Sequence, residues 1–336
     1  MIEPRGLIGF AVAFLTIAWA LSFVAGAVFF AARPWVRRQG PAAERGGAGL
    51  ALIGPPVLSS GVIAILIGHS ALGPVLGLID HCPAHDHHLH LCLFHGASWT
   101  VVAWAVALVA GLTVWSAVLV GHRALRLALA RRRLARIAAS SARLTGEHRD
   151  VLLSPATTAF CFVAGLRRPQ IFVSTAAWQR LGEDERRAMV EHERAHAAQG
   201  DLWRRTLLGL VAISNPSPLA ARLLAVWDSA TERLCDHRAA TVVGDPSALA
   251  RALVALARFE PRVPVPAHGG LAGFAPQGAS DVIERVEAVL AEGPDGGGAA
   301  RNLVRVALIG LAAVLIVAAF LSGPIHHAIE SLLGSL

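Results

Sequence analysis

Four long apolar stretches constrain what this chain can fold into more than any other feature of its sequence. They cover residues 7–32, 58–78, 101–120 and 303–321. A helix needs about 20 apolar residues to cross a bilayer, and the first three stretches reach that length. The fourth has 19 residues and contains Arg305, whose long side chain can reach the interface from near the end of a helix. The sequence therefore predicts four membrane-spanning helices.

The composition also favours a membrane protein. Of the 336 residues, 54% are hydrophobic and only 16% are charged, whereas about a quarter of the residues in a soluble globular protein are charged. The net charge is +7, and all the basic side chains counted in it are arginines because the sequence has no lysine. This preference for arginine over lysine is typical of a GC-rich bacterial genome. The composition excludes a disordered tail, a collagenous fibre and a small disulfide-rich secreted domain.

The distribution of arginine predicts how these helices are oriented. Arginines follow the stretches 7–32 and 101–120 and precede the stretch 303–321, whereas the segment between the second and third stretches contains none. Because positively charged loops stay in the cytoplasm, we expect a multi-pass protein of the bacterial inner membrane with its N-terminus outside. The arginine run 131–133 is better explained by this topology and by anionic lipid than by a nucleic-acid patch, so we expect no direct nucleic-acid binding.

The predicted topology divides the chain into three parts. Residues 1–122 form a membrane domain with three spans and an outside loop at 80–98, residues 123–300 form a cytoplasmic domain, and residues 301–336 hold the fourth span and a short outside tail. Within the cytoplasmic domain, two strand-like runs flank a turn and precede three helical regions, so we expect a mainly α membrane protein with a cytoplasmic α+β domain. The strand-like runs are 159–163 and 170–173, and the helical regions are 183–198, 219–243 and 280–291.

The first cytoplasmic helix carries an H-E-x-x-H motif, His192-Glu193-Arg194-Ala195-His196. Residues four apart share a helix face, so both imidazoles can bind one metal ion while Glu193 lies beside them. A catalytic zinc ion takes three protein ligands and leaves one position for water, from which Glu193 would remove a proton. The alternative is an ordinary solvated helix, because the motif fixes only three residues and is flanked by many charges.

A third ligand is expected from the second cytoplasmic helix. Glu232 and Asp236 are also four residues apart and share a face of that helix. Two helices that each present such a pair can cross to build a His-His-Glu site. Asp236 would then accept a hydrogen bond from the free nitrogen of a ligating histidine and fix its tautomer.

Several segments together resemble a known family of enzymes. The segments are Ser154-Pro155, the stretch 162–174, the motif at 192–196, Asp201, Asn215-Pro216 and the pattern Glu232…Cys235-Asp236. They resemble the BlaR/MecR-type integral-membrane zinc metallopeptidases and, more distantly, the HtpX and CAAX prenyl protease-like enzymes. The resemblance implies a zincin-like, gluzincin-type peptidase domain in the cytoplasm between the third and fourth spans. It also implies that the two histidines and Glu232 bind zinc and that Glu193 is the catalytic base.

The resemblance suggests roles for three other features. The strand region 164–173 is where such enzymes pair an extended substrate, although a simple core hairpin explains it equally well. His237 and Arg238 are the nearest candidates to stabilise the oxyanion of the tetrahedral intermediate. The alternative is that each is an ordinary surface residue. Asp201 is interpreted as a structural residue at a helix end. BlaR/MecR sensors also have a penicillin-binding domain after the fourth span, and we expect none here.

The predicted outside loop is unusually rich in metal-binding side chains. One interpretation is a disulfide between Cys82 and Cys92, which suits an oxidising compartment. A second, compatible interpretation is a site for a transition-metal ion, and a third is an incidental solvated loop. The remaining cysteines, Cys161 and Cys235, are expected to be reduced packing residues. The candidate residues of the loop are His81, Cys82, His85, His87, His88, His90, Cys92 and His95.

Together these patterns predict an integral-membrane zinc endopeptidase with one catalytic Zn²⁺. Its substrate would be a cytoplasmic protein or membrane-proximal peptide and, by resemblance, a winged-helix repressor of the BlaI/MecI type, which would make it a signalling protease. A membrane quality-control protease is the alternative within the enzyme class. Outside that class, the alternatives are a metal sensor or carrier that uses the loop 81–95 and a pseudoenzyme scaffold.

Overall fold

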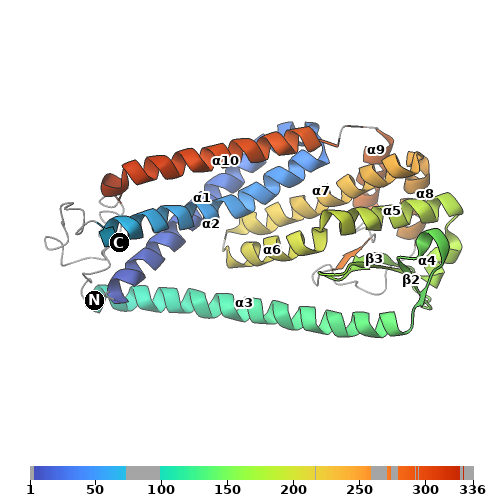
Figure 1. The fold of residues 1–336 in the computed structure, drawn as a ribbon, viewed down its shortest axis with the longest axis horizontal. Helices are drawn as coiled ribbons and strands as arrows, with labels where there is room; N and C mark the ends of the chain where they lie inside the picture. Colours follow the sequence, from blue (N-terminus) through green and yellow to red (C-terminus); the bar gives the residue numbers. More distant parts are fainter. Residues whose placement is uncertain are drawn as a thin grey trace.

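The structure is a computed structural model that describes residues 4–72, 99–215, 217–258, 271–273, 279–291, 293, 295–325 and 328. Within these residues, four helices are long and apolar enough to cross a membrane: α1 (Pro4–Arg38), α2 (Pro41–Leu72), α3 (Trp99–Ala139) and α10 (Gly297–Phe320). In Figure 1, α1 and α10 pack against α2 toward one end of an elongated molecule, and α3 runs along its length. The chain is therefore a mainly helical membrane protein, as the sequence predicted.

All four helices extend beyond the apolar stretches that predict them, and α2 and α3 extend furthest. Helix α2 begins at Pro41 rather than near residue 58, and its first turns carry Glu44 and Arg45, both buried. Buried charges are tolerated where they are paired, and both of these residues form ion pairs. Helix α3 continues to Ala139 through the arginine-rich segment, so the predicted domain boundary at residue 122 falls inside one continuous helix.

A small sheet lies at the other end of the molecule. Its strands are β1 (Ala142–Arg143), β2 (Val151–Ser154), β3 (Cys161–Ala164), β4 (Gln170–Ser174) and β5 (Leu271–Gly273), in the order β1-β2-β4-β3-β5. The predicted hairpin is formed by β3 and β4, with Val163 opposite Ile171. Gly165 begins its turn with φ of +108°, and a Cβ there would lie 2.5 Å from the carbonyl oxygen of Arg168, so only glycine fits.

Helices cover this sheet and form with it the sheet-containing part of the molecule. They are α4 (Thr175–Arg180), α5 (Glu183–Gln199), α6 (Asp201–Ser214), α7 (Pro218–Val243), α8 (Pro246–Ala257) and α9 (Ala279–Leu290). A 3₁₀ turn, η2, covers Gly146–His148. The core between the sheet and α5 and α8 includes Val163, Ile171, Met189 and Leu253, all fully or almost fully buried. Helix α5 begins with three acidic residues, which suit a helix N-terminus, and is capped after Gln199 by Gly200 in a left-handed conformation.

Helices α6 and α7 form a hairpin that packs against the membrane helices. Phe29 of α1 and Leu52 of α2 share one buried cluster with Leu208 of α6 and Trp227 of α7. Near the tip of the hairpin, a Cβ on Gly26 of α1 would lie 2.9 Å from the Leu219 side chain, so the two helices are in direct contact there. The hairpin therefore joins the sheet-containing part to the long apolar helices.

Candidate metal centre

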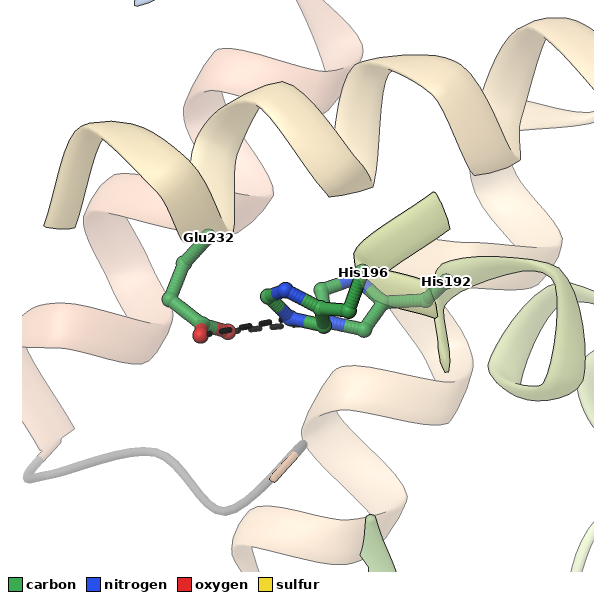
Figure 2. A group of neighbouring side chains, drawn as sticks. All are labelled: His192, His196 and Glu232. Carbon is green, nitrogen blue, oxygen red and sulfur yellow. Dashed lines mark hydrogen bonds and ion pairs between the residues drawn. The ribbon is translucent and has the colours of Figure 1, made fainter. Parts of the chain in front are cut away.

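Helix α5 presents the two motif histidines on one buried face. His192 and His196 are 0% and 1% exposed, and their Nε2 atoms are 3.1 Å apart. Their i,i+4 spacing on the helix brings both rings to the same point, as the sequence predicted. Figure 2 shows both imidazoles directed toward Glu232.

Helix α7 supplies the third member of the cluster. Glu232 Oε2 lies 3.4 Å from His192 Nε2, and Glu232 Oε1 lies 3.4 Å from His196 Nε2. A zinc ion with bonds of about 2.0–2.1 Å to nitrogen and oxygen has tetrahedral ligand–ligand edges of about 3.3 Å. The two histidine nitrogens are 3.1 Å apart, and each lies 3.4 Å from a different Glu232 oxygen, so the three residues form a triangle with spacings close to that edge length. The donor set of two imidazoles and one carboxylate therefore fits a single zinc ion.

A carboxylate fixes the far nitrogen of each imidazole. Asp236 Oδ1 lies 2.9 Å from His192 Nδ1, and Asp201 Oδ2 lies 2.9 Å from His196 Nδ1. If each Nδ1 donates to its carboxylate, each Nε2 presents a lone pair to the centre of the cluster. The sequence analysis assigned this role to Asp236 but treated Asp201 only as a helix-end residue. Gly200, with φ of +65°, separates α5 from α6, and Asp201 at the start of α6 lies beside His196.

Arg285 of α9 is a member of the site that the sequence analysis missed. It is 2% exposed, and two of its nitrogens each lie 2.7 Å from a different Asp236 oxygen, which is a bidentate arrangement. Its Nη1 also lies 3.2 Å from Glu232 Oε2. No motif marks this arginine, because it is 49 residues from Asp236 in the sequence. It holds the two acidic side chains of α7 in place.

The charges of the cluster favour a cation at its centre. Burial alone would raise the pKa of Glu232, but His196 and Arg285 hold it well below its usual range, so this carboxylate is ionised. For His196, burial lowers the pKa, but Cys235, Glu232 and Asp201 outweigh burial and leave the pKa well above its ordinary value. The histidine pair therefore attracts either a proton or a metal ion at Nε2.

Glu193 lies within the fold beside this cluster. Its side chain is 0% exposed, and neither carboxylate oxygen has a hydrogen-bond partner among the described residues. Burial raises the pKa of this carboxyl group, against the opposing effect of His192 and His196. Glu193 is thus a carboxylate with free acceptor positions, which is what a general base requires.

A second group of possible ligands lies on the other side of His196. Cys235 Sγ is 3.4 Å from His196 Nδ1 and 3.7 Å from Asp201 Oδ2. Two features oppose a metal ion at this position. Arg45 already forms an ion pair with Asp201, and burial raises the pKa of Cys235 to about 11, so the thiol keeps its proton. Asp201 and Cys235 therefore contact His196 at Nδ1, the nitrogen that faces away from Glu232. Cys235 is a buried free thiol.

The other predicted site residues are not brought to the cluster. His237 and Arg238 are the fifth and sixth residues after Glu232 and point about 140° and 120° away from it around α7. Arg238 is exposed, and no contact of either side chain with the cluster is found in the described part of the chain. The residues proposed for the outside loop, 81–95, lie outside the described residues.

The predicted substrate strand is covered in the structure. Strand β3 is flanked by β4 on one edge and by β5 on the other, where Val163 pairs with Ala272 in antiparallel register. An extended peptide therefore cannot add to this edge of β3 while β5 occupies it. The sequence around residues 271–273 is rich in proline and glycine and carries no strand pattern, so this pairing was not expected.

One comparison with known proteins found a match. Residues 124–264 match the family model described as peptidase family M48. This segment includes the sheet strands β1–β4 and the helices α5 and α7, which carry the triangle of His192, His196 and Glu232. No curated protein and no solved structure matched the chain.

Proposed function

We propose that this chain is a zinc endopeptidase anchored in a membrane. The premise is the match of residues 124–264 to peptidase family M48, which indicates a metallopeptidase. The observation that carries the proposal is the triangle of His192, His196 and Glu232, in which the histidine nitrogens are 3.1 Å apart and each lies 3.4 Å from one Glu232 oxygen, beside the buried Glu193. These residues would hold one zinc ion and leave a fourth position for water.

The residues of the chain have separate tasks in this proposal. Zinc bound there would supply Lewis-acid chemistry and make a water ligand more acidic. Glu193 would accept the water proton at a carboxylate oxygen and return it to the nitrogen of the leaving amine. Burial raises the pKa of Glu193, which shifts it toward the working pH where a general acid–base group works best. Asp236 and Asp201 would keep the two imidazoles oriented throughout.

The substrate is proposed to be a protein in the cytoplasm or near the membrane surface. The distribution of arginine supports a cytoplasmic position for residues 123–300 and an inner-membrane location in a bacterium. The sequence resemblance described above supports a signalling role in which a BlaI/MecI-type repressor is cleaved. A quality-control protease would use the same chemistry on a broader set of substrates.

Glu193→Gln tests the proposed chemistry directly. The substitution keeps the shape of the side chain but removes its ability to accept a proton. We expect zinc content to remain unchanged while the cleavage rate of an unstructured protein substrate falls by about 10²–10⁴-fold. Metal analysis and a cleavage assay on the full chain in nanodiscs provide the two measurements.

Glu191→Gln is the matched control. Glu191 lies on the same helix but pairs with Arg194 rather than with the metal cluster. We expect this variant to cleave at the wild-type rate. Wild-type cleavage by Glu193→Gln would contradict the proposal. A wild-type chain that binds zinc but cleaves nothing would instead support the sensor or scaffold interpretation, which replacement of the loop histidines 81–95 would then examine.

A further inference from the structure

Helix α2 places two opposite charges at its start, and both are buried. Glu44 and Arg45 are 0% and 6% exposed. Glu44 pairs with Arg33 of α1 and Arg233 of α7, whereas Arg45 contacts the region of the metal centre. Charges in a candidate membrane helix are costly unless they are paired, so their partners point to a role.

Arg45 contacts the outer side of the metal centre through its guanidinium group. Its Nη1 donates to Gln199 Oε1 at 2.5 Å, and its Nη2 forms a short ion pair with Asp201 Oδ1. The other oxygen of Asp201, Oδ2, bonds to His196 Nδ1 at 2.9 Å. A guanidinium on a membrane helix is therefore two hydrogen bonds away from a candidate zinc ligand.

The position of Arg45 is fixed by the helices that carry the ligands. Its guanidinium carbon lies 4.9 Å from the ring centroid of Trp227, which stands on α7 five residues before Glu232. Gln199 is the last residue of α5, and its amide also donates to Cys235 of α7 at 3.4 Å. Arg45 thus touches the end of α5, the start of α6 and the middle of α7 at once.

We infer that Arg45 is a positioning residue for the metal centre, so that the affinity of the centre for its metal depends on how α2 is seated against the peptidase domain. The inference rests on the proposed function for the identity of the centre. Without Arg45, the Asp201 carboxylate would be buried with no cation to balance it and would hold His196 Nδ1 less well. Any displacement of α2 within the membrane would have the same effect on His196.

The test is a titration of Co²⁺ into metal-free protein in nanodiscs, with the visible spectrum as readout. We expect Arg45→Met to weaken Co²⁺ binding by about tenfold or more and to alter the spectrum, as changes behind a ligating histidine do. Asp201→Asn should give a similar loss. Because both residues act on the same bond, the double variant should lose much less than the product of the two single effects.

Glu44→Gln is the matched control, because Glu44 is the adjacent residue and equally buried but does not contact Asp201. We expect it to lower the melting temperature while the Co²⁺ affinity stays within about twofold of wild type. If Arg45→Met does not fold, Arg45→Lys is measured instead. It retains the charge but cannot reach Gln199 and Asp201 with one planar group, so weaker binding and a shifted spectrum are expected.

The outcomes separate this inference from the proposed function. Absence of Co²⁺ binding by the wild-type chain would contradict the proposed metal centre itself. If Arg45→Met binds Co²⁺ with wild-type affinity and gives an unchanged spectrum, only the positioning role of Arg45 would be overturned. An equal loss of affinity in Glu44→Gln would also overturn it, because any buried charge of α2 would then have the same effect.

Discussion

At the scale of single residues, the candidate centre depends on side chains behind the ligands as much as on the ligands. Asp236, Asp201 and Arg285 do not take part in the triangle, yet they determine which nitrogen of each imidazole faces the centre and where Glu232 lies. Such outer contacts orient ligands and raise their basicity. The site should therefore be sensitive to substitutions that leave all three ligands intact.

Arg285→Met tests this dependence through stability. The substitution leaves the buried Asp236 carboxylate without its bidentate partner, and breaking a buried ion pair costs about 3–5 kcal/mol. We expect the free energy of unfolding to fall by that order in a urea titration of the detergent-solubilised chain. Arg251→Met is the control, because Arg251 is 54% exposed and its pairs with Glu185 and Asp245 contribute less than about 1 kcal/mol. Equal effects of the two substitutions would contradict the role given to Arg285.

At the scale of helices and strands, the sequence predicted those pairs of site residues that lie four apart on one helix. The spacing of His192 and His196, and that of Glu232 and Asp236, follows directly from 3.6 residues per turn. Contacts between distant elements have no such local signal. Asp201 reaches His196 only because Gly200 adopts a left-handed conformation, and Arg285 reaches Asp236 only because α9 folds back against α7.

Hydropathy failed for the start of α2 for a related reason. Glu44 and Arg45 interrupt the apolar pattern and so appear to exclude a span, but their partners on other elements neutralise them within the fold. The covering of β3 by β5 was equally hidden, because three residues in a proline- and glycine-rich segment carry no strand pattern. Both features depend on tertiary contacts rather than on local sequence.

The α6–α7 hairpin gives a prediction at this same scale. Its tip contacts α1 near Gly26, which lies seven residues, or roughly 10 Å, deeper along that helix than Arg33. If Arg33 marks the membrane surface, the tip enters the bilayer. In a background without the four native cysteines, Ser214→Cys in nanodiscs should react slowly with a membrane-impermeant maleimide. Ser140→Cys, at the exposed end of α3, should react fast, and equal rates would contradict the insertion.

At the scale of the whole molecule, the candidate centre draws on parts of the chain beyond the matched peptidase segment. Residues 124–264 contain the three ligands and Glu193, but Arg45 and Arg285 lie on α2 and α9, outside that segment. Helices α2 and α9 therefore supply the arginines that pair with the two carboxylates behind the histidine ligands. A fragment limited to the matched segment would lack both arginines that balance its buried carboxylates.

The zinc content of the purified chain is the most direct test of the candidate metal centre. We expect one zinc ion per chain in the wild type, with a lower melting temperature after the metal is removed by a chelator. We expect close to none in a His192→Ala, His196→Ala double variant that remains folded. Zinc absent from a folded wild-type chain, or retained in full by the double variant, would contradict the candidate metal centre.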